Sequence, residues 1–195
     1  MKFVSTIAMS LSLALLASGA ALAQKAPAAA MPEYSFLKNT IWYVPQSTLP
    51  APEMNPQDGT VRMLSDQTVW RITNYHQGYF WGNIVAQLRN GSGKPVGDPT
   101  CMRMMASVTP DGKVLATFIP PMPGGAVLAV RGDGTLTMGI DKSWRFEMQM
   151  SSGLQKLVAH WSYMVQCKEG DACNAQLPGT DLSLPSFLAL CTPKP

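Results

Sequence analysis

Alternating apolar and polar positions run through most of this chain and predict β-strands. The densest stretch is residues 66–88, in which two alternating segments flank a turn at His76-Gln77-Gly78. Because successive side chains of a strand point to opposite faces, such alternation indicates a strand with one buried face. We therefore interpret residues 66–88 as the central hairpin of an all-β domain. Its second strand has a predicted core face made of Phe80, Gly82, Ile84, Ala86 and Leu88.

Similar segments recur along the chain, separated by turn sequences. Thr-Pro-Asp-Gly at 109–112 and Arg-Gly-Asp-Gly at 131–134 are typical of hairpin turns. The proline-rich stretch 45–59 is predicted to be a long irregular loop, of the kind that often borders a site. Strands are predicted at 40–44, 60–64, 67–75, 80–88, 102–108, 113–119, 126–130, 135–140, 144–150 and 157–165.

About nine strands at regular spacing, without an amphipathic helix, indicate an antiparallel meander. Closure of the meander into a barrel removes the unpaired edges that an open sheet would expose. The predicted fold is therefore an all-β barrel, with a two-sheet β-sandwich as the alternative. The tail 181–191 is expected to add one short helical turn.

The first residues have the features of a secretory signal peptide. Lys2 precedes an apolar run at 7–16, and the small residues Ala21 and Ala23 mark a cleavage site. We expect residues 1–23 to be a signal peptide, 24–33 a flexible leader rich in Ala and Pro, and 34–195 a single β-barrel domain. The apolar run is shorter than the roughly 20 residues of a membrane span, so no transmembrane segment is predicted. The expected location is the periplasm or the extracellular medium.

Charge and composition narrow the class of partner. Removal of Lys2 with the signal peptide leaves 14 basic against 12 acidic residues. This balance is too close to neutral to favour nucleic acid or an anionic membrane surface. Only 14% of residues are charged, which indicates either a large core or an apolar surface that has a function.

All four cysteines lie in the part expected to be exported, where thiols are normally oxidised. Four cysteines allow three pairings. We predict Cys167 with Cys173, because the polar loop between them readily closes, which leaves Cys101 with Cys191. A zinc site is the competing interpretation, but the spacing of Cys167 and Cys173 differs from that of common zinc motifs.

The residues that could carry chemistry do not form a catalytic pattern. His76 lies in a predicted turn and His160 on a polar strand face, and neither has a nucleophile and an orienting acid at a fixed spacing. The methionines of the run 101–105 would suit copper, but Met102 and Met104 fall on a predicted core face. We therefore predict no catalytic residue, no metal and no cofactor, and favour a protein that is not an enzyme.

Aromatic residues are the strongest candidates for ligand contacts. Each of the five tryptophans lies on a different predicted strand, and inward aromatic residues of a small barrel either fill it or line a pocket. Small residues beside them would leave room inside the barrel. The candidate ligand-binding residues are Trp70, Trp81, Trp144, Trp161 and Tyr163.

The opening Asn39-Thr40-Ile41-Trp42-Tyr43 resembles the first strand of calycin barrels, the lipocalin and avidin group. The hallmark of that group is Gly-x-Trp near the mature amino terminus, and Thr40 stands where the glycine is expected. The resemblance implies an up-and-down barrel with a ligand cavity at one mouth. It also implies that Trp42 packs at the closed end and does not contact ligand.

Two functions follow from these predictions. The first is an exported barrel that binds a small apolar or amphipathic molecule, which requires an internal cavity. The alternative is a protein-interaction module of the cell envelope, such as an inhibitor of a secreted hydrolase, acting through loops 45–59 and 120–125. That alternative requires a packed interior and an exposed apolar patch.

Overall fold

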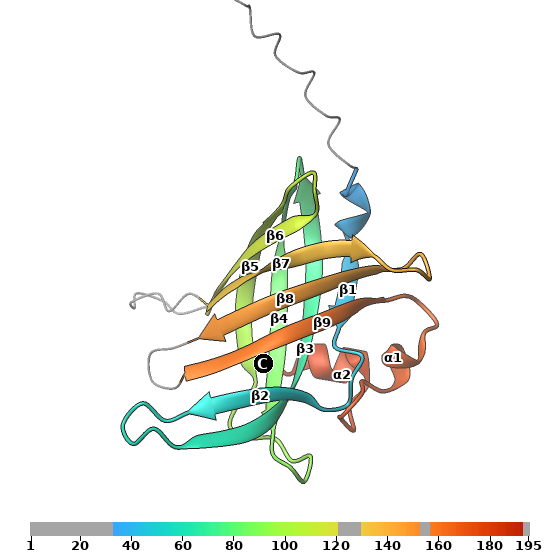
Figure 1. The fold of residues 1–195 in the computed structure, drawn as a ribbon. Helices are drawn as coiled ribbons and strands as arrows, with labels where there is room; N and C mark the ends of the chain where they lie inside the picture. Colours follow the sequence, from blue (N-terminus) through green and yellow to red (C-terminus); the bar gives the residue numbers. More distant parts are fainter. Residues whose placement is uncertain (1–32, 121–129, 153–156, 193–195) are drawn as a thin grey trace, which may run out of the picture.

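The computed structural model describes residues 33–120, 130–152 and 157–192. The predicted signal peptide, nearly all of the predicted leader and residues 121–125 of the predicted loop 120–125 lie outside these ranges. Within them, no helix is long and apolar enough to span a membrane. The elements, drawn in Figure 1, are η1 (Ser35–Leu37), β1 (Thr40–Tyr43), β2 (Leu49–Met54), β3 (Val61–His76), β4 (Tyr79–Arg89), β5 (Thr100–Val108), β6 (Lys113–Ile119), β7 (Val130–Met138), β8 (Trp144–Ser152), β9 (Leu157–Cys167), α1 (Ala172–Ala175) and α2 (Leu184–Ala189).

The strands form one antiparallel sheet that closes on itself. From β3 to β9 each strand pairs with the next along the chain. β1 and β2 share the remaining position, because both lie between β9 and β3. β1 pairs with β3 at 69–72 and β2 pairs with it at 61–66. The result is an eight-position barrel, so the predicted all-β barrel is confirmed.

Three predicted boundaries were wrong. Residues 49–54 form β2 and not part of a loop, since alternate prolines leave the residues between them to bond with β3. The predicted strands 60–64 and 67–75 are one strand, β3. Residues 131–134 continue β7 and do not turn. A Cβ on Gly134 would overlap the carbonyl oxygen of Glu147 in β8, so this glycine permits close strand contact.

Aromatic side chains fill the barrel interior. Phe146 of β8 is fully buried, and its ring centroid lies 4.6 Å from that of Trp42, 5.2 Å from Trp70 and 5.8 Å from Phe80. Trp70 also contacts Phe118 of β6 at 5.5 Å. These rings come from strands all round the barrel, so they are the centre of its core. The buried positions Phe80 and Ile84 confirm the core face predicted for β4.

One end of the barrel is covered by η1, beside the tip of the β3–β4 hairpin (Figure 1). Leu37 is fully buried there, and the ring of Phe36 stacks on Trp144 at 5.2 Å. Thr40 donates a hydrogen bond to the Leu37 carbonyl at 2.5 Å and accepts one from the Trp42 indole N–H at 2.8 Å. Thr40 therefore connects the barrel core to the segment that covers this closed end.

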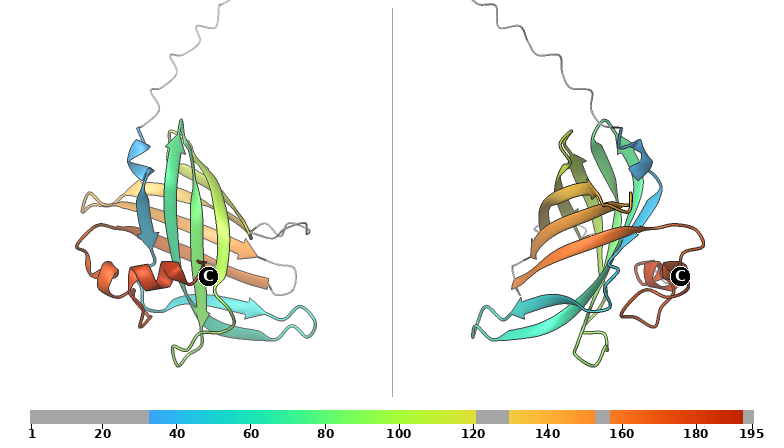
Figure 2. Two further views of the ribbon diagram at one scale, coloured as in Figure 1. Left: turned by 180° about the vertical axis from the view of Figure 1, so that it is seen from behind. Right: turned by 45° about the vertical axis from the view of Figure 1, so that its right-hand side comes forward.

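The carboxy-terminal segment packs against the outside of the barrel. Figure 2 shows α1 and α2 against the outer side of β3 and β4. Phe187 and Leu184 of α2 are buried there against Val69 and Val85. Cys101 of β5 is bonded to Cys191. The second disulfide joins Cys167 to Cys173, so the structure has both predicted pairs.

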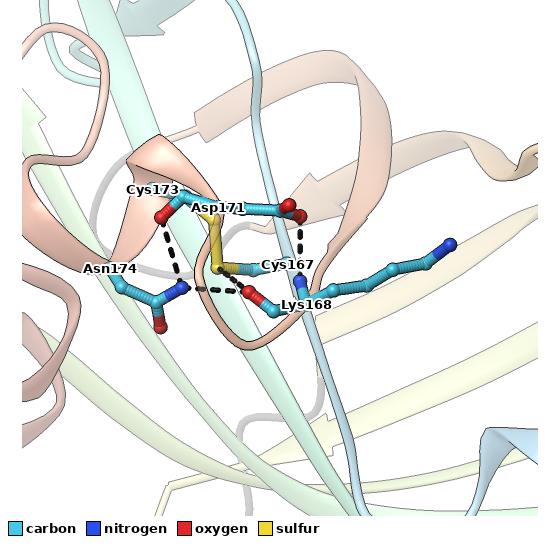
Figure 3. Close-up of a disulfide and its surroundings, with 5 residues drawn as sticks. All are labelled: Cys167, Lys168, Asp171, Cys173 and Asn174. Carbon is cyan, nitrogen blue, oxygen red and sulfur yellow. Dashed lines mark hydrogen bonds between the residues drawn. A yellow bond between two sulfur atoms is a disulfide. The ribbon is translucent and has the colours of Figure 1, made fainter.

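The second disulfide closes a short turn between β9 and α1 (Figure 3). The Lys168 backbone N–H donates to the Asp171 carboxylate at 2.8 Å. The Asn174 side chain donates to the carbonyl oxygens of Lys168, at 2.7 Å, and Asp171, at 3.0 Å. These bonds satisfy polar groups in a turn too short for regular structure.

Candidate ligand site at the open end of the barrel

The barrel end opposite η1 contains a pocket of about 110 Å³. At this end residues 55–60 join β2 to β3 and residues 90–99 join β4 to β5, whereas turns of two to five residues join β3 to β4, β5 to β6 and β7 to β8 at the η1 end. We call this space the mouth pocket. Its lining residues come from six strands: Asp66, Thr68, Ile84, Ala86, Leu88, Thr100, Met102, Val130, Met150, Ser151 and Val158.

Strand register explains why these side chains meet. Asp66 of β3 lies opposite Leu88 of β4, and Thr68 lies opposite Ala86. Side chains directly opposite one another in an antiparallel pair lie on the same face of the sheet. Ala86 has only a methyl group, which leaves space at its level. The next inward residue of β3 is Trp70, which is fully buried and lies beyond the pocket, toward the closed end.

Asp66 gives the mouth pocket its polar character. It is 4% exposed, and its Oδ2 accepts a hydrogen bond from Thr68 Oγ1 at 2.5 Å. A buried carboxylate needs such donors, because removal of its charge from water is costly. A carboxylate has about four acceptor positions, which makes Asp66 the strongest hydrogen-bond acceptor in the pocket wall. The mouth pocket therefore combines an apolar wall with a strong acceptor.

A second carboxylate is buried at the same end of the barrel. Glu53 of β2 lies opposite the pocket residue Val158 and is 8% exposed. Its Oε1 accepts a hydrogen bond from Arg62 Nε at 2.6 Å, and this bond raises the pKa of the Arg62 guanidinium. Glu53 is thus held in an ion pair at the rim.

The five predicted ligand-binding residues do not share a cavity. Trp70 lies inside the barrel, and Trp144 is half-buried against η1. Trp81, Trp161 and Tyr163 lie on the outer face, where Trp161 is 48% exposed. Trp161 and Tyr163 line one hollow together, on the outer surface of the barrel.

The pairing of β9 explains the position of Trp161 and Tyr163. Ser162 and Met164 are buried and lie opposite Met148 and Phe146 of the core. Their neighbours along the strand must then face outward. Both faces of this strand carry large side chains, so the sequence pattern alone did not settle which one is buried.

Sequence analysis did not identify Asp66 as a site residue. A signal was present, because Asp66 falls on the same side of the alternating pattern as Thr68, Trp70 and Ile72, the side that is buried in the structure. A charged residue on the core face of a strand is unusual and indicates a specific role. The predicted strands 60–64 and 67–75 leave residue 66 between them, so the predicted boundaries did not show that Asp66 belongs to the same strand as Thr68.

One of the two histidines lies far from this site, at the other end of the barrel. His76 is exposed at the β3–β4 turn, and the side chain of His160 is not among those described. In the described part of the chain, no three His, Cys, Asp or Glu side chains lie close enough to hold a metal ion.

Two larger hollows lie on the outer surface of the barrel, over β7, β8 and β9. Their volumes are about 650 Å³ and about 570 Å³, and both are lined by Asp133, Gln149 and Trp161. We call them together the Trp161 groove. The first also includes Gln46, Thr135, Arg145, Glu147 and Tyr163, and the second Pro50, Pro52, Met63 and Ala159.

The eight-position antiparallel barrel, with its covered end at η1, is compatible with a calycin-like fold. Comparisons of the chain with protein-family models, curated proteins and solved structures found no match.

Proposed function

We propose that this protein binds an amphipathic small molecule whose apolar end enters the mouth pocket. The observation that carries the proposal is a mainly apolar pocket at the uncovered end of the barrel, with the buried carboxylate of Asp66 in its wall. Apolar concave sites with a few placed polar groups are typical of small-molecule binding.

The volume of the pocket limits the part of the ligand that enters. An apolar protein cavity of roughly 150 Å³ holds benzene, so about 110 Å³ suits a short alkyl chain or a small ring. The rest of a larger ligand would remain outside the barrel. Aromatic side chains already fill the interior beyond Trp70, which argues against full enclosure of a large ligand.

The position of Asp66 suggests the orientation of the ligand. Asp66 is two residues nearer the open end than Thr68, and Trp70 lies two residues deeper. An apolar tip would contact Ile84 and Met102, and a donor group closer to the rim would reach the Asp66 carboxylate. A primary amine is the best match, because a charge-assisted hydrogen bond is about twice as strong as a neutral one.

The signal-peptide pattern and the two disulfides support a role outside the cytoplasm. In that setting the ligand would be taken from the periplasm or the medium. The alternative of an interaction module acting through loops 45–59 and 120–125 has less support. Residues 49–54 of the first loop form β2, and residues 121–125 of the second are not described.

Calorimetry with three ligands of equal chain length tests the proposal. Hexylamine should bind more tightly than hexanol, and hexanol more tightly than hexanoate, because Asp66 attracts the ammonium group and repels the carboxylate. Asp66→Asn should reduce the preference for the amine about tenfold. Asp133→Asn, which removes an exposed carboxylate from the outer face, should leave it unchanged.

Filling the pocket gives an independent test. Ala86→Leu places three extra carbons in the mouth pocket and should weaken the binding of every ligand that enters it. Circular dichroism checks that the variant folds. Equal affinity for hexylamine and hexanoate would contradict the proposal. So would undiminished binding to Ala86→Leu.

Native mass spectrometry of protein from its own host, before and after organic extraction, should show an amphipathic molecule of low mass.

A further inference from the structure

The Trp161 groove lies on the outer face of the barrel wall and the mouth pocket on the inner face, and Met150 and Ser151 line both the second hollow of the groove and the mouth pocket. Strand register places Trp161 of β9 opposite Gln149 of β8, and Gln149 opposite Asp133 of β7. Neighbouring strands are about 4.8 Å apart, so the three side chains form a short row on the outer surface. Trp161 is 48% exposed, and Asp133 and Gln149 are exposed beside it.

Asp133 and Gln149 supply the polar groups of this row that a ligand could contact. Across the described residues, the side chains of Asp133 and Gln149 make no hydrogen bond and no ion pair. Arg145, at one end of the groove, is already engaged. It donates to Asp141 at 2.8 Å and lies over the ring of Tyr163, 5.7 Å from its centroid. Trp161 is exposed and Tyr163 is half-buried, so Trp161 is the more accessible of the two aromatic side chains of the groove.

We propose that the Trp161 groove binds a neutral oligosaccharide. A pyranose ring has an apolar face of C–H groups and a rim of hydroxyl groups. The indole of Trp161 suits the C–H face, since it supplies a large, rigid apolar surface. The Asp133 carboxylate accepts hydrogen bonds from hydroxyl groups, and the Gln149 amide both accepts and donates them.

Charge and shape both favour a neutral, extended sugar. Asp133, Glu147 and Arg145 together carry a net charge of about −1, which does not select a strongly ionic ligand. The hollows extend to both sides of Trp161, and each volume falls within the roughly 300–1,000 Å³ of small-ligand sites. A chain of several sugar rings would occupy both hollows and stack its central ring on Trp161. A single sugar ring would use only part of the groove.

Titration calorimetry with cellohexaose, chitohexaose and maltohexaose tests this inference. At least one hexasaccharide should bind at millimolar concentration or below, and more tightly than its monosaccharide. Trp161→Ala should weaken that binding about tenfold or more, and Trp161→Phe, which keeps an aromatic platform, should weaken it less. Asp133→Asn should weaken it about fivefold to tenfold.

Trp81→Ala is the matched control. Trp81 also lies on the outer face of the barrel, with 37% exposure, but on β4 and outside the groove. This variant should bind the sugar as the unchanged protein does. Asp66→Asn should also leave sugar binding unchanged. A failure of the proposed amine binding in the mouth pocket can therefore be distinguished from a failure of the proposed sugar binding in the groove.

Three results would overturn the inference. The first is that none of the three hexasaccharides binds at millimolar concentration. The second is an equal loss of binding in Trp161→Ala and Trp81→Ala. The third is displacement of the bound sugar by hexylamine in the unchanged protein, which would place both ligands in the mouth pocket. Tight binding of an unfolded peptide to the groove, in place of the sugars, would identify it as a protein-interaction surface.

Discussion

At the residue scale, Gly82 shows how a single missing side chain lets two strands approach. It lies in β4 opposite Ile72, where the register between β3 and β4 shifts. A Cβ at this position would overlap the backbone carbonyl oxygen of Arg71. Backbone atoms cannot move away as the end of a flexible side chain can. Any other residue at position 82 would therefore separate the longest strand pair of the barrel.

Gly82→Ala should lower the free energy of unfolding by about 3 kcal/mol, because the two backbones must move apart and lose hydrogen bonds. Urea denaturation followed by circular dichroism measures the change. Gly91→Ala is the control, since nothing lies within 4 Å of a Cβ there. It should change stability by no more than about 0.5 kcal/mol. Similar values for the two variants would show that β3 and β4 tolerate a side chain at position 82.

At the element scale, the carboxy-terminal segment is held to the barrel by packing and by a long-range disulfide. α2 has only six residues, too few for a stable isolated helix. Ser183 caps its amino terminus by accepting a hydrogen bond from the Ser186 N–H at 3.3 Å. The buried side chain of Phe187 provides the tertiary contact. The bond between Cys101 and Cys191 keeps this short helix close to its binding surface.

The two disulfides should contribute unequally to stability. Cys101 and Cys191 are 90 residues apart, whereas Cys167 and Cys173 are 6 apart. On the loop-entropy account, the double variant Cys101→Ser/Cys191→Ser should lose about 4 kcal/mol and Cys167→Ser/Cys173→Ser about 2 kcal/mol. Denaturation of both variants under identical conditions gives the comparison. Faster amide exchange at Phe187 in the first variant alone would confirm the tethering role, and the reverse order of stabilities would contradict it.

At the scale of the whole molecule, the two ends of the barrel differ. Aromatic rings and η1 fill and cover one end, while small and polar side chains leave the mouth pocket at the other. Phe146 is the central ring of the filled half, in contact with Trp42, Trp70 and Phe80. This asymmetry provides a rigid core that supports a site near the rim.

Phe146→Ala should destabilise the protein by about 4 kcal/mol, because it removes a fully buried ring and leaves a cavity among rings that cannot collapse into it. Thermal and urea denaturation measure the loss. Met138→Ala, at a residue of 54% exposure, is the control and should change stability by no more than about 0.5 kcal/mol. A small effect of Phe146→Ala would mean that the barrel core is loosely packed.

The strand content and much of the core were predictable because they depend on local alternation. Phe80 and Ile84 were placed in the core by their spacing alone, and both are buried. The strand at 113–119, in contrast, is apolar on both faces, a pattern typical of a strand covered on both sides. Leu115 is 48% exposed and Ile119 40%, since within residues 33–120, 130–152 and 157–192 no further layer covers the outer side of β6. Apolar content indicates what a strand could bury, but the surrounding elements determine what it does bury.

The sequence by itself determined the all-β class, and it favoured a barrel over a β-sandwich and the two disulfide pairs that the structure has. Side-chain alternation and turn chemistry act over a few residues, so they can be read without a structure. Only the tertiary structure decided the position of the candidate sites. Asp66 and Ala86 meet through the β3–β4 register, and Trp161 faces outward because Ser162 and Met164 pair with the core. Register and the direction of each face depend on strands distant in the chain, and for this reason they were not accessible from local pattern.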